Sequence, residues 1–496
     1  MNLRITRIWV ASLAALTLAS CAQGLDDSER FSGGVTNTTL QSPVLTDESF
    51  SAIMNPDGTE SVNVKWPVVY GAGGYLCNVA IVDNPSDPVK VVNDSILDGC
   101  SLTFPRLEDT KYEVSIKTLG NPKYNNKDAE SASVYAYETM LPATTVPAGT
   151  EISQFINNYL AENPGTDEIG FELEGGATYQ LDGVLDFGLR KATFRGNKGS
   201  HHPTVMVNNE AAITTQAGLK VKWINFDCTN ATADALLLLS DTPSETISIE
   251  ALGYKALGAN QTGYIIEDPV SFEDVKVKNL PKSFIYGNKT PWSLRDFRIE
   301  NCLIQLNNAT SMTFLNLHEG KNGLFKNLSI SNSTIYNIVD NDQAYFIRYA
   351  NQSNARPEKI FGTGEVSEHK ISNCTFSKTF SGKDFANQMP QTNAITVRID
   401  HCIFYDVFRL YQYMHNNINR YTSFNTICGI TNPVNSNDVG GRKDTNGNPY
   451  ATEENPDFTG PVNIELDLTK ENGGVNFKPK ASYASQNMIG DPRWFE

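Results

Sequence analysis

The chain has 496 residues, 40% of them hydrophobic and 19% charged, which is enough apolar sequence to bury large cores and excludes a disordered chain. Its 40 Lys and Arg residues stand against 56 Asp and Glu residues, giving a formal net charge of −16 at pH 7. A surface of that sign repels a phosphate backbone, which excludes general nucleic-acid binding as the default function.

The first twenty residues have the pattern of a secretory signal. Arg4 and Arg7 precede an apolar run over residues 8–18, which is too short to cross a bilayer as a helix. The run ends in Leu-Ala-Ser before Cys21, which resembles a bacterial lipobox, in which the Cys is lipidated and becomes the first mature residue. We therefore expect a signal peptide over residues 1–20 and a lipid on Cys21. The alternative is an ordinary cleavage site with a chance Cys.

Residues 21–43 are polar and rich in Gly, Ser and Thr, and we expect a flexible spacer there. From residue 44 to residue 141, apolar and polar residues alternate in short runs, which predicts half-buried antiparallel strands. Trp66 on an early strand, Leu107 five residues before Tyr112, and a length of about 100 residues resemble a fibronectin type III module. Such modules are commonly spacers, so we expect a structural role for this domain.

Two cysteines of this domain, Cys77 and Cys100, fall on apolar strand faces. Export permits a disulfide between them. Two buried free thiols are nevertheless the preferred interpretation, because the sequence does not supply the Cα separation that a disulfide requires.

Residues 142–150 are rich in Pro and Thr and are predicted to form a linker. Apolar residues then recur at helical spacing from Ile152 to Leu160, with Thr150 placed as the N-cap. We predict one amphipathic helix here. The remainder consists of short β-runs separated by Gly, Asn and Asp, with no second helix expected.

Residues 151–496 contain an internal repeat in four segments, residues 297–304, 328–335, 369–376 and 397–404. Each segment carries alternating apolar residues, then Asn or His, then Cys or Ser. The matching positions 301, 332, 373 and 401 are 31, 41 and 28 residues apart, which fits solenoid coils with insertions of unequal length. Stacked coils would align these positions into ladders, as in a right-handed parallel β-helix of the pectate-lyase-like kind. The predicted fold class is all-β, a fibronectin-like sandwich followed by this β-helix with one N-terminal capping helix.

Residues 397–402 resemble a segment of pectate lyases in which an Asp helps to hold calcium beside a uronate; Asp400 occupies that position. The same pattern recurs near Arg298, where no site is expected, so a structural role is the preferred interpretation. If the protein is a lyase, β-elimination requires an Arg or Lys as base and a cation beside the carboxylate. The catalytic candidates are then Arg348, Arg398, Asp400 and Arg409, with calcium as the cofactor. Otherwise no metal or cofactor is expected.

Tyr and Arg residues are concentrated between residues 345 and 421. Sugars present C–H faces to aromatic rings, and their hydroxyl or carboxylate groups bind Arg, so this composition suits a polysaccharide groove. Its expected lining is Tyr345, Arg348, Tyr349, Arg409, Tyr411 and Tyr413. Ordinary packing is the alternative, because alternate members of each run point inward.

Taken together, the lipobox, the sandwich and the coil repeat resemble Bacteroidetes surface lipoproteins that accompany SusC/SusD-type glycan uptake systems. Residues 489–494 resemble the closing segment of those proteins. The resemblance implies a surface-exposed outer-membrane lipoprotein, held by its lipid anchor, with a polysaccharide and a SusC/SusD-type transporter as partners. We expect an accessory protein that binds a pectic or otherwise acidic polysaccharide. A polysaccharide lyase and a purely structural surface protein are the alternatives.

Overall fold

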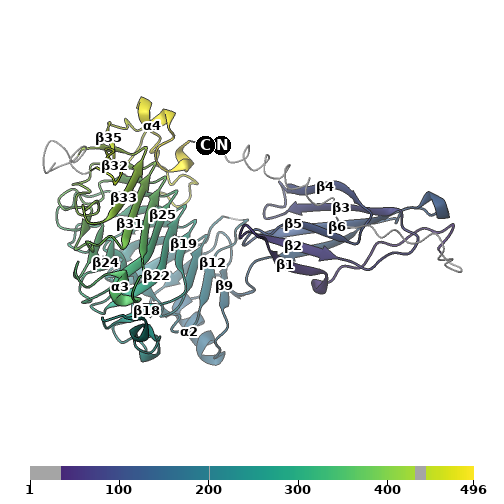
Figure 1. The fold of residues 1–496 in the computed structure, drawn as a ribbon, viewed down its shortest axis with the longest axis horizontal. Helices are drawn as coiled ribbons and strands as arrows, with labels where there is room; N and C mark the ends of the chain where they lie inside the picture. Colours follow the sequence, from purple (N-terminus) through teal and green to yellow (C-terminus); the bar gives the residue numbers. More distant parts are fainter. Residues whose placement is uncertain (1–34, 200, 430–442, 496) are drawn as a thin grey trace. The chain divides into compact units, whose positions relative to one another are not determined.

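The structure, a computed structural model, describes residues 35–199, 201–429 and 443–495 (Figure 1). The chain divides into two compact units, Met1–Leu141 (unit 1) and Pro142–Glu496 (unit 2), and both are built mainly from β-strands, so the all-β class is confirmed. The expected signal peptide and Cys21 lie outside the described residues. In the part of the chain that is described, no helix is long and apolar enough to cross a membrane.

Unit 1 consists of two antiparallel sheets, ordered β1-β2-β5 and β4-β3-β6-β7. The strands are β1 (Phe50–Met54), β2 (Glu60–Lys65), β3 (Gly74–Ile81), β4 (Val89–Leu97), β5 (Ser101–Pro105), β6 (Lys111–Leu119) and β7 (Ser133–Glu138). Alternate residues of these strands, such as Val62, Val64, Val114 and Ile116, are buried in one core. The alternation in the sequence therefore marks the inner faces of the two sheets.

The segment before β1 differs from the expected flexible spacer. Thr39 pairs with Lys127, and the Thr118 hydroxyl donates a 2.9 Å hydrogen bond to the Gln41 carbonyl. The Ser42 hydroxyl donates a 2.7 Å hydrogen bond to the Ser131 carbonyl. The end of the predicted spacer is thus bound to the sandwich, because its backbone groups find partners about 80 residues later in the chain.

Tyr112 ties the loop after β5 to the core of unit 1. Its hydroxyl accepts a 2.8 Å hydrogen bond from the Leu107 amide and donates a 3.0 Å bond to the Pro105 carbonyl. Cys77 and Cys100 are both free thiols, so the disulfide alternative is not realised. Burial raises the pKa of the Cys77 thiol to about 12, which leaves it protonated and unreactive at neutral pH.

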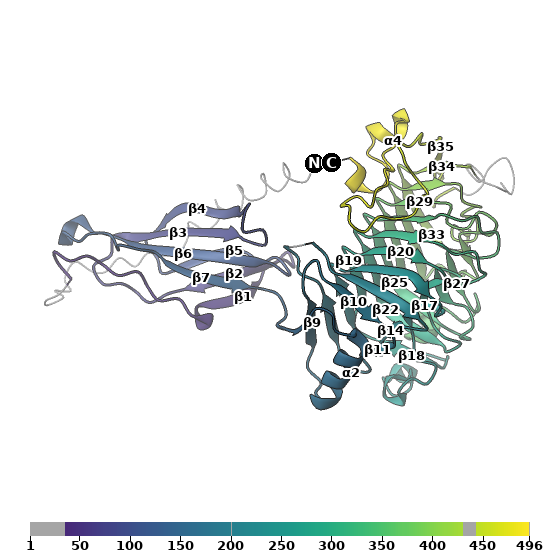
Figure 2. The ribbon, with the colours of Figure 1, turned by 180° about the vertical axis from the view of Figure 1, so that it is seen from behind.

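Unit 2 contains, within the described residues, three parallel sheets that the chain visits in turn (Figures 1 and 2). Sheet I comprises β8 (Ala143–Val146), β9 (Ile169–Leu173), β12 (Ala192–Arg195), β15 (Leu219–Lys222), β19 (Val270–Glu273), β22 (Trp292–Glu300), β25 (Leu324–Ser331), β28 (Ser367–Ser372), β31 (Ile395–Asp400) and β33 (Asn419–Ser423), with β18 (Tyr264–Ile266) paired to β22. Sheet II comprises β10 (Thr178–Leu181), β13 (Thr204–Asn209), β16 (Asn225–Ala231), β20 (Lys276–Leu280), β23 (Leu303–Leu306), β26 (Thr334–Asn337), β29 (Thr375–Ser377), β32 (Ile403–Tyr405), β34 (Thr426–Cys428) and β35 (Thr452–Glu453). Sheet III comprises β11 (Val184–Asp186), β14 (Ala212–Thr214), β17 (Ala235–Leu238), β21 (Ser283–Tyr286), β24 (Leu315–Leu317), β27 (Ile347–Tyr349) and β30 (Ala386–Asn387).

The sequence repeat is reproduced in the register of the coils. In sheet I, Ile299 pairs with Ile330, which pairs with Ile371, which pairs with Ile399. All four side chains are buried in the interior, so the repeat marks one internal ladder.

The corner that follows each of these strands explains the Asn or His of the repeat. Asn301, Asn332, Asn373 and His401 all have positive φ, between 49° and 54°, a left-handed conformation that Asn tolerates better than most residues. The Asn373 side-chain amide donates a 3.2 Å hydrogen bond to the Asn332 side chain. The corner therefore carries a contact between Asn side chains of neighbouring coils.

Two corrections apply at the start of unit 2. Residues 143–146, expected within the linker, form β8, which pairs in parallel with β9. Helix α2 (Ile152–Glu162) is capped by Glu151 and not by Thr150, because the Glu151 carboxylate accepts hydrogen bonds from the amides of Ser153 and Gln154. The helix packs its buried Ile152 and Ile156 against the core of the first coil.

Two further short helices, α3 (Pro357–Ile360) and α4 (Ser482–Gln486), were not expected. Each spans about one turn, which is too short to give a helical period in the sequence. Short 3₁₀-helices occur at η1 (Asp47–Ser49), η2 (Pro122–Tyr124), η3 (Glu245–Ile247), η4 (Tyr254–Leu257) and η5 (Pro492–Trp494).

Residues 454–495, which we call the cover segment, lie on the outer face of sheet II (Figure 2). Leu303 and Tyr336 point outward from that sheet and pack against Phe477 and Trp494 of the cover segment. The Trp494 indole also donates a 2.8 Å hydrogen bond to the Thr334 hydroxyl. Sheet II is therefore buried on both faces over these coils.

Candidate functional site

Two residues of the expected carbohydrate groove lie in the interior instead. Tyr349 and Tyr413 are completely buried. The Tyr349 hydroxyl lies 3.4 Å from Nε2 of the buried His369, and the Tyr413 ring stacks on the His369 ring with centroids 6.1 Å apart. The expectation that these two tyrosines bind a ligand is wrong, because they fill the core.

Arg348 points outward from sheet III and is the centre of the candidate site. Asn316, Arg348 and Asn387 pair in register on neighbouring strands β24, β27 and β30. The Arg348 Nε donates a 3.2 Å hydrogen bond to the Asn387 side-chain oxygen, and its guanidinium carbon lies 5.1 Å from the Tyr345 ring centroid. Among the residues that the structure describes, Arg348 has no carboxylate within ion-pair distance.

The Arg348 guanidinium is partly buried, and this affects both its pKa and the hydrogen bonds that it can form. Burial lowers the pKa of the half-buried guanidinium, although the group stays charged at neutral pH. A guanidinium has five N–H donors, and among the residues that the structure describes only one donor of Arg348 forms a hydrogen bond to a neighbouring side chain. A partly desolvated cation with unused donors favours an anionic ligand over water.

His318 and Glu319 follow β24 and lie beside Arg348. Burial, and then the charge of Arg348, lower the pKa of His318, so this ring is neutral at pH 7. Glu319 accepts a 2.5 Å hydrogen bond from the Tyr286 hydroxyl. Burial and this bond raise the pKa of Tyr286, which keeps its proton and holds Glu319 in place.

Arg409 and Tyr411 lie near the next coil, where Arg409 pairs with Asp384 across an isolated β-bridge. The Arg409 guanidinium makes two contacts to the Asp384 carboxylate, one of them 3.3 Å long, and lies 4.9 Å from the Phe408 ring and 5.3 Å from the Tyr411 ring. Because this cation already has a carboxylate partner, it is less available to a ligand than Arg348.

The four residues expected for a lyase do not form one site. Arg398 and Asp400 are on β31 of sheet I, whereas Arg348 is on β27 of sheet III. The Arg398 Nε donates a 2.7 Å bond to Glu368, and its guanidinium lies 4.6 Å from the Tyr421 ring. Asp400 accepts hydrogen bonds from His401 and Ser423, so its carboxylate holds the corner of its own coil.

Metal binding gives no further candidate in the described residues, where no group of three or more His, Cys, Asp or Glu side chains is placed to hold an ion. The Asp444 carboxylate holds a turn, in which it accepts hydrogen bonds from the amides of Asn446 and Asn448.

Sequence reasoning missed four residues around Arg348, namely Tyr286, Asn316, Glu319 and Asn387. Tyr286, Asn316 and Asn387 were findable, because they lie 62, 32 and 39 residues from Arg348, which is one or two coil lengths. The strands of sheet III are too short to show a repeat of their own, and this hid the alignment.

Two family models match the chain. Residues 2–177 match a domain of unknown function, DUF4992, and residues 177–338 match a second domain of unknown function, DUF4957. The first match covers unit 1 and continues through α2 and β9 into unit 2, and the second ends just after β26. Neither a curated protein nor a solved structure matches the chain.

Proposed function

We propose that the protein is a polysaccharide-binding accessory protein and that the glycan binds the outer face of sheet III around Arg348. The observation that carries this proposal is a half-buried guanidinium that leans on the Tyr345 ring and lacks a carboxylate partner among the described residues. The carboxylate of a uronate is a suitable partner for it, and the half-buried Asn387 offers its side-chain amide to a sugar hydroxyl. The favoured ligand is therefore a pectic or other acidic polysaccharide.

We further propose a fold type for each of the two units. Unit 1 is fibronectin type III-like, which is supported by its three-plus-four strand order and by the two hydrogen bonds of Tyr112, as in a tyrosine corner. Unit 2 is a right-handed parallel β-helix, supported by three parallel sheets visited in turn and by the strong right-handed preference of parallel crossovers. Helix α2 caps its first coil.

The proposal also places the protein at the cell surface. Cys21 carries the lipid and holds the protein in the outer membrane, where a SusC/SusD-type transporter is the proposed partner. The lipobox pattern in the sequence supports this placement. Cys21→Ala should move the protein from the membrane fraction to the soluble fraction, while Cys100→Ala should leave it with the membrane. Membrane association of the Cys21→Ala protein would show that the anchor lies elsewhere.

The glycan site is tested by affinity gel electrophoresis in polygalacturonate and in neutral polysaccharides at low salt. Arg348→Ala should reduce retardation by polygalacturonate about tenfold in apparent Kd, because one charge-assisted interaction is lost. The matched control is Lys480→Ala, which removes an exposed cation paired with Asp457 on the cover segment and should change nothing. Equal retardation of the Arg348→Ala and wild-type proteins would refute this site.

The same incubations, followed by the absorbance of unsaturated uronate products, separate binding from cleavage. Product formation that depends on Arg348 and on added calcium would establish the lyase instead. Neither retardation nor product across a broad glycan panel would favour the structural role.

A further inference from the structure

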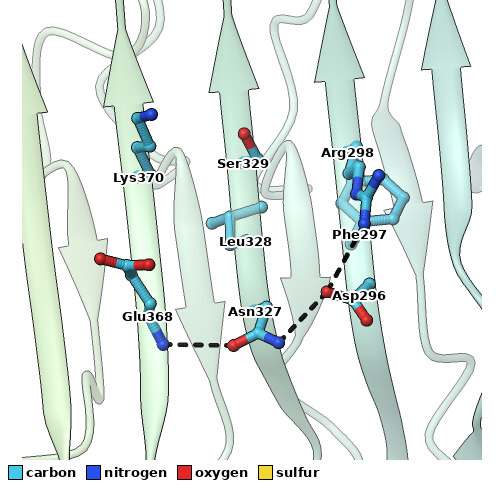
Figure 3. Close-up of a pocket in the computed structure, with 8 residues that line it drawn as sticks. All are labelled: Asp296, Phe297, Arg298, Asn327, Leu328, Ser329, Glu368 and Lys370. Atoms are coloured by element: carbon cyan, nitrogen blue, oxygen red, sulfur yellow. Dashed lines mark hydrogen bonds and ion pairs between the residues drawn. The ribbon is translucent and has the colours of Figure 1, made fainter. Parts of the chain in front are cut away.

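The outer face of sheet I has a hollow of about 190 Å³ centred on β25 (Figure 3). Its polar lining consists of Asp296, Arg298, Asn327, Ser329, Glu368 and Lys370. None of these residues belongs to the site around Arg348. The hollow is therefore a separate feature of the surface.

Side-chain length along three paired strands creates the hollow. Ser329 on β25 lies in register between Arg298 on β22 and Lys370 on β28. Because neighbouring strands are about 4.8 Å apart, the two long cations rise from backbones roughly 10 Å apart, with a short hydroxyl between them. Figure 3 shows both cationic side chains standing on either side of Ser329.

The acceptors in this hollow are already engaged. Asp296 accepts a 3.1 Å hydrogen bond from the side-chain amide of Asn327, whose oxygen in turn accepts a 3.4 Å bond from the Glu368 amide. The Glu368 carboxylate pairs with Arg398 at 2.7 Å. The Asp296 and Glu368 carboxylates therefore already bind donors of the protein.

The donors are available. In the described part of the chain, the Lys370 ammonium and the Ser329 hydroxyl make no hydrogen bond or ion pair, and Lys370 is exposed. Arg298 makes one contact to a carboxylate, 4.0 Å from Asp296, and half of its side chain is exposed. The unsatisfied groups of the hollow are consequently N–H and O–H donors on two cations and one hydroxyl, which is the complement of an anion.

We propose that this hollow binds one anionic substituent, a carboxylate or a sulfate ester, of an acidic polysaccharide, with Arg298 and Lys370 on either side and Ser329 beneath it. A hollow of this volume suits one substituted sugar and not a large ligand. The proposal shares with the proposed function only the polysaccharide as carrier of the anion. A second contact on one long polymer raises its overall affinity without any change at the first.

The experiment compares the Arg298→Ala/Lys370→Ala double variant with a matched Lys470→Ala/Lys480→Ala double variant, which removes two exposed cations from the cover segment. The probes are polygalacturonate, its methyl-esterified neutral form and dextran sulfate, all at low salt in affinity gels. The double variant in the hollow should bind polygalacturonate or dextran sulfate at least tenfold more weakly than the control variant does. Ser329→Glu, which places a carboxylate between the cations, should have the same effect.

The probes identify the anion: loss confined to polygalacturonate assigns a carboxylate, and loss confined to dextran sulfate assigns a sulfate ester. Unchanged binding of both anionic polymers by the hollow variants overturns the proposal, as does an equal loss with the neutral polymer. Arg348→Ala serves as the independent arm. If Arg348→Ala has no effect while the hollow variants lose binding, the site on sheet III is refuted and the hollow is supported. If Arg348→Ala loses binding while the hollow variants do not, only the hollow is refuted. A thermal unfolding curve for each variant confirms that the fold is retained.

Discussion

The outer faces of sheets I and II differ although the same coils build both. On sheet II the outward residues include Leu303, Tyr336 and Ile403, which are buried beneath the cover segment. On sheet I the outward positions carry Arg298 and Lys370, which are exposed. The comparison teaches that the outward side chains, and not the geometry of the coils, decide whether a sheet face is covered. Outward apolar residues are buried by a further segment of the chain, whereas outward charged residues stay exposed to solvent and to ligands.

The largest expected effect lies in the covered face. Trp494→Ala removes a nearly buried indole and its bond to Thr334, so we expect a loss of about 3–5 kcal/mol in the free energy of unfolding of unit 2. Urea denaturation measures it. Met488→Ala in the same segment removes a side chain that is 37% exposed and should cost less than about 0.5 kcal/mol. Similar costs for both variants would mean that the cover segment contributes little stability.

The second prediction concerns the pH dependence of stability that is caused by His369. This residue points inward from β28, between the outward Glu368 and Lys370. Burial lowers the pKa of His369 from 6.5 to about 4, so the folded protein binds fewer protons than the unfolded chain between these values. Titration of His369 does not reduce the free energy of unfolding above pH 6.5. As the pH drops from 6.5 toward 4, it lowers that free energy by about 3 kcal/mol. Urea denaturation at several pH values should show a smaller loss on acidification for His369→Phe than for the wild type. Identical slopes would show that His369 is not the titrating group.

The third prediction concerns the corner between sheets I and II. Asn373→Ala removes the bond to Asn332 and puts Ala at φ 54°, so we expect a loss of about 1–2 kcal/mol. Asn373→Gly removes the same bond but tolerates the backbone conformation, and should cost less. A greater loss for the Gly variant, measured by urea denaturation, would contradict a backbone origin of the difference.

The smallest expected effect separates the two arginines beside sheet III. Arg409→Lys keeps a cation near Asp384, and we expect polygalacturonate affinity to change less than about threefold. Arg348→Lys should weaken it more, because Lys loses the planar donors and the stacking on Tyr345. Affinity gels run in parallel measure both. A larger effect at Arg409 would move the centre of the site toward Tyr411.

The sequence predicted the coil register well because one repeat position, the buried Ile, must face the interior in every coil. It predicted the outward Tyr345 and Arg348 but placed Tyr349 wrongly. The reason is a break in alternation: Phe346 and Ile347 are both buried, and both of their amides donate to the Phe385 carbonyl, at 3.1 Å and 2.9 Å. A strict two-residue period cannot anticipate such a bend.

Other errors came from contacts distant in the sequence. The bound end of the spacer depends on Thr118 and Lys127, and β8 depends on pairing with β9. Neither partner can be read from the local composition of the segment. The hollow on sheet I was likewise invisible, because a short Ser329 matters only when its neighbours in register are Arg298 and Lys370.

The position of the cover segment in the chain has a consequence for biosynthesis. Residues 454–495 follow all the strands of sheet II on which they lie, so during synthesis the coils are made before their cover. Until the cover segment is synthesised, Leu303, Tyr336 and Ile403 form an exposed apolar stripe that is prone to aggregation. A chain interrupted before residue 454 keeps this stripe exposed, and we expect chaperones or proteases to recognise it.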